Sequence, residues 1–352
     1  MKKRYIPMRI LLAFSTFMLT VLLLSCQQTG KKPVISADKN VRVSLETFAL
    51  ADIRIRDPFI LADEASGTYY MYAQTGNRDD SAEKGVEAYT STDLENWTGP
   101  TPVFSFPKRF WADYQVWAPE VHKYKDRYYL FVTLSSTDIL KAPPPTTHEK
   151  WPQQVKRGTQ ILVADSPEGP FIPFRNKAHT PADWSALDGT LHVEDGIPYM
   201  VFCHEWTQIG DGSMEVVQLS EDLSEPVDVP LTLFHAGEAS WVVPVLEQGK
   251  VTDGCFLYTT GNGQLIMLWS SIGEKGYAMG QAISQSGFII GPWEDGGLLF
   301  EENGGHGMIF ESFEGELILC FHQPNVSPQE RAQLYRIADE DDRLVLRSKF
   351  NK

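Results

Sequence analysis

A repeat of about 62 residues restricts the fold of this chain more than any other feature of the sequence. A polar or acidic residue opens a short apolar run at five places, namely Asp57, Glu120, Asp188, Glu238 and His306. A second landmark, a proline after a turn rich in Ser or Asp, recurs with nearly the same period at Pro100, Pro170, Pro226 and Pro292. Two independent landmarks with one period indicate five structural units.

The runs inside each unit have the composition of β-strands. Aromatic and β-branched residues fill segments such as 68–74, 127–134 and 255–260, and turn residues separate them. Helical periodicity is nearly absent after residue 40. Units of four antiparallel strands repeated radially form a β-propeller. The sequence therefore predicts an all-β fold, a five-bladed β-propeller over residues 41–352, with a pair of β-sandwiches as the alternative.

The N-terminus has the features of an export signal. Residues 1–9 carry four cations and residues 10–24 are apolar, a run too short to favour spanning a bilayer. The sequence Leu23-Leu24-Ser25-Cys26 resembles the lipobox of bacterial lipoproteins, which implies cleavage after residue 25 and lipidation of Cys26; an ordinary secretory signal is the alternative. Residues 26–40 would then form a tether. We expect a protein of the cell envelope, anchored to the outer membrane and facing periplasm or medium.

Charge and cysteine content exclude several classes of protein. With 31 Lys and Arg against 46 Asp and Glu, the net charge is −15, which argues against a nucleic-acid partner. The 12% aromatic content suits a sugar-binding surface, although packing must account for most of it. Apart from Cys26, the cysteines Cys203, Cys255 and Cys320 lie in apolar runs, so we expect buried thiols rather than a disulfide framework or a zinc site.

The propeller geometry gives the acidic landmarks a chemical meaning. The innermost strand of each blade lines the central channel, so its first residues should converge on one mouth. The second strands should end at the same mouth, and polar pairs follow them at Gln74-Thr75, His204-Glu205 and His322-Gln323. Convergent carboxyl groups suit glycoside hydrolysis, which needs one acid to protonate the leaving oxygen and one carboxylate to activate water or attack carbon.

Several motifs in order and at blade spacing carry a resemblance to a known family. They are Arg56-Asp57-Pro58-Phe59, Trp117-Ala118-Pro119-Glu120-Val121, Leu187-Asp188-Gly189, Gly237-Glu238-Ala239 and Gly291-Pro292-Trp293. Over roughly residues 50–340 the chain resembles glycoside hydrolase family 43. The resemblance implies an inverting enzyme with Asp57 as general base, Glu238 as general acid and Asp188 as the residue that orients the acid. It also implies that His306 lies near the channel axis, where relatives hold a structural calcium ion or water; no other cofactor is expected.

Other residues are candidates for substrate binding. Glu205 is a rival for the acid, because it too should reach the mouth. Trp111, Trp117 and Trp206 are candidates for stacking on sugar rings, with core packing as the alternative for each. A Pro-rich insertion at residues 141–157 is expected to wall one side of the pocket and to favour exo action.

The resemblance leads to an expected activity. We expect a monomeric enzyme that releases terminal pentose or furanose sugars from an oligo- or polysaccharide, with α-L-arabinofuranoside first and β-D-xyloside or β-D-galactofuranoside next. Endo action on arabinan or xylan is one alternative. A non-catalytic glycan-binding propeller and a retaining fructosidase-like enzyme are the others.

Overall fold

The computed structural model describes residues 45–77, 83–140 and 150–350. The predicted signal peptide, the lipidation site at Cys26 and the tether over residues 26–40 lie outside this part of the chain. Of the helices in the described ranges, none has the length and hydropathy needed to cross a bilayer. The described residues all belong to the unit that begins at Leu45.

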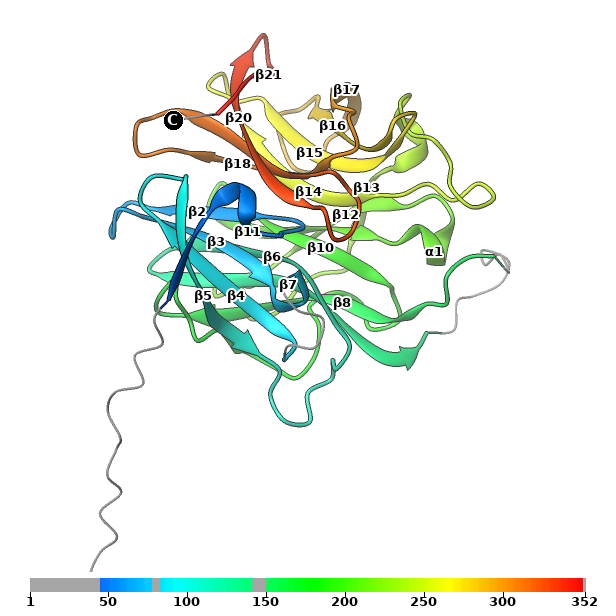
Figure 1. Ribbon diagram of the computed structural model, residues 1–352. Helices are drawn as coiled ribbons and strands as arrows, with labels where there is room; N and C mark the ends of the chain where they lie inside the picture. The colour runs from blue at the N-terminus through cyan, green and yellow to red at the C-terminus, as the bar shows by residue number, and fades with distance from the viewer. Residues whose placement is uncertain (1–44, 78–82, 141–149, 351–352) are drawn as a thin grey trace, which may run out of the picture. The chain divides into compact units, whose positions relative to one another are not determined.

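Five antiparallel sheets make up this unit, as predicted (Figure 1). Blade one contains β1 (Glu46–Ala49), β2 (Phe59–Asp63), β3 (Thr68–Gln74), β4 (Gly85–Ser91) and β5 (Asn96–Ser105). Blade two contains β6 (Gln115–Tyr124), β7 (Arg127–Ile139), β8 (Val155–Ala164) and β9 (Ile172–Pro173). Blade three contains β10 (Ala186–Glu194), β11 (Ile197–His204), β12 (Ser213–Gln218) and β13 (Leu231–His235).

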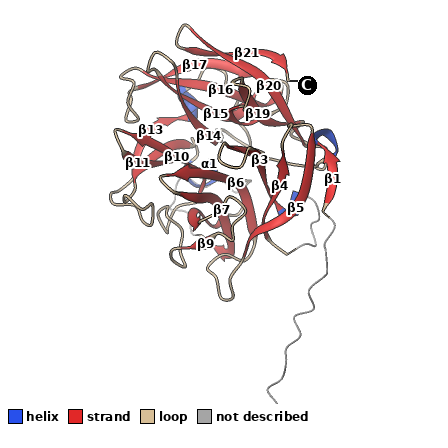
Figure 2. Cartoon of the chain, turned by 90° about the vertical axis from the view of Figure 1, so that its left-hand side faces the viewer, coloured by secondary structure: helices blue, strands red, loops and turns tan. Residues whose placement is uncertain are grey.

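The last two blades follow the same plan. Blade four contains β14 (Asp253–Thr259), β15 (Leu265–Gly273), β16 (Gly276–Ser284) and β17 (Trp293–Phe300), and blade five contains β18 (Gly305–Glu311), β19 (Leu317–Gln323), β20 (Arg331–Glu340) and β21 (Arg343–Lys349). The described helices are short, as Figure 2 shows: η1 (Leu50–Asp52), η2 (Thr75–Asn77), α1 (Trp206–Ile209) and η3 (Ala236–Glu238).

The first strand of each repeat is the inner strand of its blade. The inner strands β2, β6, β10, β14 and β18 contact one another in ring order, and β18 contacts β2. The segment before β2 joins the last blade to the first. Arg54 forms an isolated β-bridge with Arg331 of β20, and the Ile55 N–H donates to the Glu330 carbonyl at 3.2 Å. These contacts close the five-bladed ring.

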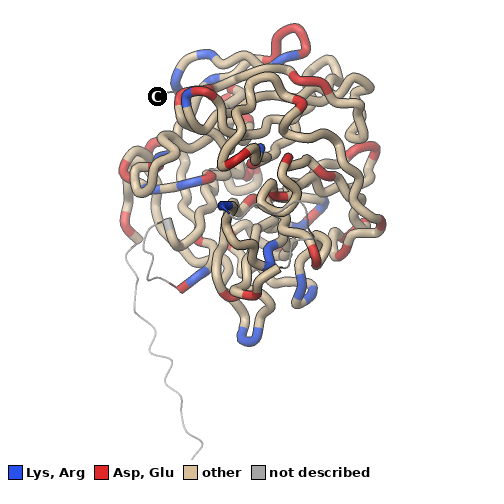
Figure 3. The backbone as a smooth tube through the Cα atoms, turned by 90° about the vertical axis from the view of Figure 1, so that its right-hand side faces the viewer, with Lys and Arg blue, Asp and Glu red and all other residues tan. Residues whose placement is uncertain are grey.

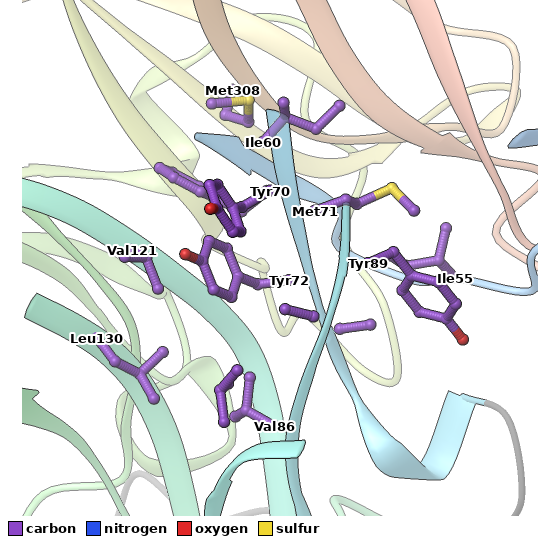
Figure 4. Packing of buried hydrophobic residues seen from close by; sticks show 14 of the residues in the cluster. Ile55, Ile60, Tyr70, Met71, Tyr72, Val86, Tyr89, Val121, Leu130 and Met308 are labelled. Carbon is purple, nitrogen blue, oxygen red and sulfur yellow. The ribbon is translucent and has the colours of Figure 1, made fainter. Parts of the chain in front are cut away.

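Apolar side chains fill the seams between blades. One cluster joins blades one, two and five through residues such as Ile60, Tyr72, Val121, Leu130 and Met308 (Figure 4). Each fully buried aliphatic side chain of this kind stabilises the fold by about 1.5–3 kcal/mol. The strands are buried on both faces by neighbouring blades, which is why the middle of a run such as β3 is aromatic and apolar and only its ends are polar.

The three cysteines of the described part confirm the prediction of buried thiols. Cys203, Cys255 and Cys320 are free and buried. They lie in β11, β14 and β19 and pack in the blade cores.

Every blade carries one residue with positive φ at the start of its inner strand. These residues are Asp57 (52°), Ala118 (43°), Asp188 (55°), Gly254 (51°) and His306 (57°). In β6, β10, β14 and β18 the strand pairing shifts register at this point, as a β-bulge requires. A left-handed backbone is unfavourable for residues other than glycine, costs about 1–3 kcal/mol, and is concentrated at functional sites.

These positions correct two members of the predicted repeat. The period of about 62 residues is confirmed, but Ala118 and Gly254 occupy the positions that the sequence assigned to Glu120 and Glu238. In blade four only glycine fits, because a Cβ on Gly254 would lie 2.7 Å from Cγ of His306. The apolar run after Glu238 is a connection between blades three and four, not an inner strand.

Candidate active site

A cavity of about 520 Å³ lies where the inner strands begin. All five blades contribute to its wall, including Asp57 and Gln74 of blade one, Trp117 of blade two, Asp188 of blade three and Asp253 of blade four. Ser327 and Glu330, between β19 and β20, complete it on the side of blade five. Its volume is in the usual range for ligand sites, about 300–1,000 Å³. The predicted convergence of the inner strands on one pocket is confirmed.

Asp57 is buried at the base of this cavity, with 8% of its surface exposed. Its Oδ1 lies 3.3 Å from Nδ1 of His306 and 3.2 Å from Nδ1 of His322, and its Oδ2 lies 3.8 Å from Nε of Arg56. Burial by itself raises the pKa of this carboxyl group. The charge of His306, the hydrogen bond with His322 and the Arg56 guanidinium outweigh burial, so the pKa lies below its usual value. Asp57 is therefore ionised at neutral pH.

Asp188 is a neighbouring carboxyl group with the opposite tendency. Its backbone N–H donates to Oγ1 of Thr133 at 2.7 Å, and its Oδ2 accepts from the Gly254 N–H at 3.2 Å. Burial, the adjacent Asp253 and then Asp57 raise the pKa of Asp188 well above its usual value. Two carboxyl groups in one buried site, one with a lowered and one with a raised pKa, form an arrangement typical of acid–base catalysis.

Asp188, Asp253 and His306 also form a candidate metal site. Each offers one ligand atom, and these atoms lie within 4.8 Å of one another. The residues fit a divalent cation because the Asp188–Asp253 pair concentrates negative charge in a buried place, which is what raises the pKa of Asp188. Calcium takes six to eight oxygen ligands, so water or substrate would have to supply the others. The prediction that His306 lies beside the carboxylates of the channel is confirmed.

Glu205 lines the same cavity from the end of β11. Its Oε2 forms an ion pair with Nη1 of Arg157 and accepts a hydrogen bond of 2.8 Å from Oγ of Ser185. Its backbone N–H donates to the Ser185 carbonyl at 2.9 Å, which fixes the residue at the start of α1. The structure thus brings Glu205 together with Asp57 and Asp188.

Glu238 does not lie with these carboxylates, which corrects the prediction that it converges with them. It ends η3, after the outermost strand of blade three, and is exposed. Its Oε1 accepts a hydrogen bond of 2.8 Å from the His235 N–H. It lines a separate cavity of about 340 Å³ between blades three and four, with Phe234 and Trp293. The physical reason is that the fourth inner strand begins at Asp253, not at Glu238.

Two of the three predicted tryptophans line the central cavity. Trp117 and Trp206 are in its wall, whereas Trp111 is not among the described residues that form it. The Trp111 indole Nε1 instead donates to Oε1 of Gln160 at 2.5 Å, and its backbone N–H donates to Asn176. These local hydrogen bonds hold Trp111 outside the cavity, and its role in substrate binding stays a prediction.

The end of the predicted insertion contacts the cavity wall. Residues 141–149 lie outside the described part, but the Trp151 ring packs edge-on against Trp206, with ring centroids 5.5 Å apart. The Trp151 Nε1 donates to the Leu246 carbonyl at 2.7 Å. These contacts hold Trp206 beside Glu205.

The sequence reasoning missed several charged residues at this site, among them Asp253 in the cavity wall and Arg157, the partner of Glu205. Asp253 carried a usable signal, since Asp253-Gly254 repeats Asp188-Gly189 at close to one period. Arg157 carried none, because nothing in a single basic residue at the start of β8 indicates a carboxylate partner in another blade. Only the tertiary structure shows that Arg157 forms an ion pair with Glu205.

Comparisons with known proteins agree with this geometry. The profile of the family described as Glycosyl hydrolases family 43 matches residues 50–338. The structure of an endo-arabinase from Bacteroides thetaiotaomicron VPI-5482 superposes with a TM-score of 0.74 and 37% identity, covering 84% of this chain and 98% of that one. An α-L-arabinofuranosidase from Lactobacillus brevis shares the fold, with a TM-score of 0.66 and 18% identity over 83% of this chain and 93% of that one.

A curated relative matches over a shorter stretch. The extracellular endo-alpha-(1->5)-L-arabinanase 1 of Bacillus subtilis (strain 168) is 32% identical over 60 residues, which is 15% of this chain and 19% of that protein. The profile match spans residues 50–338 and so includes Asp57, Asp188 and Glu205, and the Bacteroides structure covers 84% of the chain. The chain is a glycoside hydrolase and belongs to family 43.

Proposed function

We propose that this enzyme cleaves α-1,5-linked arabinan within the chain, by inversion at the anomeric carbon. The observation that carries this proposal is the 37% identity with an endo-arabinase along 98% of that chain. The shorter match to an endo-α-(1→5)-L-arabinanase points to the same substrate. Endo action, an alternative in the sequence analysis, is thereby favoured over release of terminal sugars.

Three of the carboxyl groups in the cavity wall support a hydrolytic role. A propeller that only binds glycans has no need for Asp57, Asp188 and Glu205 around one space. Burying them together is unfavourable unless their ionisation is used. The aromatic residues Trp117 and Trp206 supply apolar surface for sugar rings in the same wall.

The proposed reaction uses Asp57 as base and Glu205 as acid. A water molecule gives a proton to the ionised Asp57 while its oxygen bonds to the anomeric carbon. The bond from that carbon to the leaving oxygen breaks, and Glu205 gives its proton to that oxygen. Asp188, whose Oδ2 accepts a hydrogen bond from the Gly254 N–H, places a third carboxyl group beside these two. A divalent cation held by Asp188, Asp253 and His306 would neutralise the charge of that carboxylate pair.

The test is the product pattern from debranched linear arabinan treated with residues 27–352. Early release of arabino-oligosaccharides of mixed length is expected, with β-anomers appearing first by NMR. Arabinose as the only early product would replace the proposal with an exo-acting arabinofuranosidase. An α-anomer as first product would contradict inversion and favour the retaining mechanism. A Glu238→Gln variant is the matched control and should behave like the unmodified enzyme.

We further propose that Cys26 is lipidated and keeps the enzyme at the cell envelope. Growth with a radioactive fatty acid should label the full chain and not a Cys26→Ser variant. Equal labelling of the two would contradict the anchor, and the expected place at the outer membrane would then lose its basis.

A further inference from the structure

Arg157 is a partly buried cation beside the proposed acid, although the described residues that line the cavity do not include it. It lies in β8 of blade two, and 10% of its side chain is exposed. Its Nη1 pairs with Oε2 of Glu205 in blade three, and its Nε donates to Oγ of Ser135 at 3.1 Å. Its guanidinium carbon stands 4.1 Å from the centroid of the Trp117 ring. One side chain therefore touches the acid and the aromatic wall of the cavity.

These contacts distinguish the two oxygens of Glu205. Arg157 and Ser185 both donate to Oε2. Oε1 receives no hydrogen bond from the described residues. An oxygen that accepts two donors, one of them charged, is a poor place for a proton. A proton on Glu205 therefore belongs on Oε1.

We propose that Arg157 is the positioning residue for the general acid. Arg157 binds Oε2 of Glu205, so the proton that is transferred lies on Oε1. Arg157 also stacks on Trp117, which fixes the position of Glu205 relative to a sugar bound to the Trp117 ring. This inference rests on the proposed role of Glu205 and deepens it. Positioning matters because displacement of a catalytic group by about 1 Å can cost 100-fold in rate.

A purely structural role is the competing explanation, because Arg157 also forms an isolated β-bridge with Ser185 and so joins blades two and three. The two explanations differ in their dependence on the leaving group. Acid assistance is essential when the leaving oxygen belongs to a sugar and nearly dispensable when it belongs to an acidic phenol. A merely structural defect would slow both reactions alike.

The experiment compares Arg157→Met with the unmodified residues 27–352 on two substrates, linear arabinohexaose and the 2,4-dinitrophenyl glycoside of α-1,5-arabinotriose. Methionine keeps an apolar stem against Trp117 but has no donor. We expect kcat on arabinohexaose to fall about 100-fold, within the range for general acid catalysis. The dinitrophenyl substrate should change by less than about threefold. Arg127→Met, which removes an exposed ion pair with Asp165 from the same blade, is the matched control and should leave both substrates unchanged.

Two further comparisons distinguish loss of the positioning role from misfolding of the Arg157→Met variant. Arg157→Lys keeps a cation and should lose less than Arg157→Met, again on arabinohexaose alone. In a Glu205→Gln background, Arg157→Met should cost nothing further, because both changes remove the same function. Equal losses on both substrates, or additive losses in the double variant, would overturn the inference while leaving the proposed function intact. An unmodified enzyme that hydrolyses neither substrate would overturn the proposed function and this inference with it.

Discussion

Two cavities of this propeller contain carboxylates, and they differ in what surrounds those carboxylates. In the central cavity Asp57 and Asp188 are 8% and 4% exposed and stand on left-handed residues of inner strands. In the cavity between blades three and four, Glu238 and Asp295 are exposed and accept hydrogen bonds from nearby backbone N–H groups. The second cavity also has three acidic residues in its wall, so the presence of acidic residues alone does not mark a catalytic centre.

The difference lies in ionisation. In the central cavity Asp253 and Asp57 add to burial and raise the pKa of Asp188. At Asp295 burial also raises the pKa, but hydrogen bonds from the backbone N–H groups of Ser240 and Gly297 outweigh it, and the pKa is lowered. Figure 3 shows that acidic and basic segments are spread over the whole tube and also occur in its middle. The comparison teaches that catalytic carboxylates are recognised by crowding in a buried place.

The largest expected effect is the loss of activity in Asp57→Asn. The substitution keeps the shape of the side chain but removes the base, so kcat on linear arabinan should fall by about 1,000-fold or more. Circular dichroism should show an unchanged fold. If Asp57→Asn retained a tenth of the activity, Asp57 would not be the general base. The central cavity would then lose its assignment as the active site.

The two glutamates give the next largest contrast. Glu205→Gln should lower kcat on arabinan by about 100-fold to 1,000-fold, because the amide has no proton to give. Glu238→Gln should leave kcat and KM unchanged, since Glu238 lies in the other cavity. If Glu238→Gln lowered kcat on the same arabinan and Glu205→Gln did not, Glu238 would be the general acid, as the sequence predicted.

A buried histidine outside both cavities predicts a pH-dependent stability. His179 accepts from the Ile161 N–H at Nδ1 and donates to the Ser224 carbonyl from Nε2. Burial is the main cause that lowers its pKa from 6.5 to about 4. The unfolded chain therefore binds the extra proton first, and stability is lost as the pH falls from about 6.5 to 4. The loss is about 3 kcal/mol.

Urea unfolding at pH 7 and pH 4 measures this loss. His179→Gln keeps one donor and one acceptor but does not titrate, so its stability should fall by about 3 kcal/mol less over the same interval. Identical pH dependence in the two proteins would mean that His179 has no part in it. Both proteins retain Asp57 and Asp188, so the titration of these two groups cancels in the comparison and the remaining difference belongs to His179.

The smallest expected effect concerns the tryptophans. Trp206 lines the cavity beside Glu205, and loss of one aromatic contact of about 1–1.5 kcal/mol corresponds to a rise in KM of roughly tenfold for Trp206→Ala. Trp111→Ala should leave KM unchanged, because its indole is bonded to Gln160 outside the cavity. Steady-state kinetics on arabinohexaose would measure both, and a larger KM for the Trp111 variant would contradict the cavity described above.

Much of the site could be predicted because three of its residues occupy the repeat itself. Asp57, Asp188 and His306 lie at the same point of blades one, three and five, and a shared period brings such positions together in a closed ring. Blades two and four depart from the pattern with Ala118 and Gly254. An acidic residue lies near each of these positions, Glu120 near Ala118 and Asp253 beside Gly254. To decide which residue faces the channel, one must know where the inner strand begins.

The amino-acid sequence by itself determined the number of blades, the all-β architecture and the place of Asp57, Asp188 and His306, because strand alternation and a fixed repeat are local patterns. Only the tertiary structure decided which glutamate joins them. Glycine is required at position 254 because of the His306 ring beside it, and Glu205 becomes part of the site because Arg157 of another blade pairs with it. Both depend on contacts between residues 48 or more positions apart, and no local pattern records such contacts.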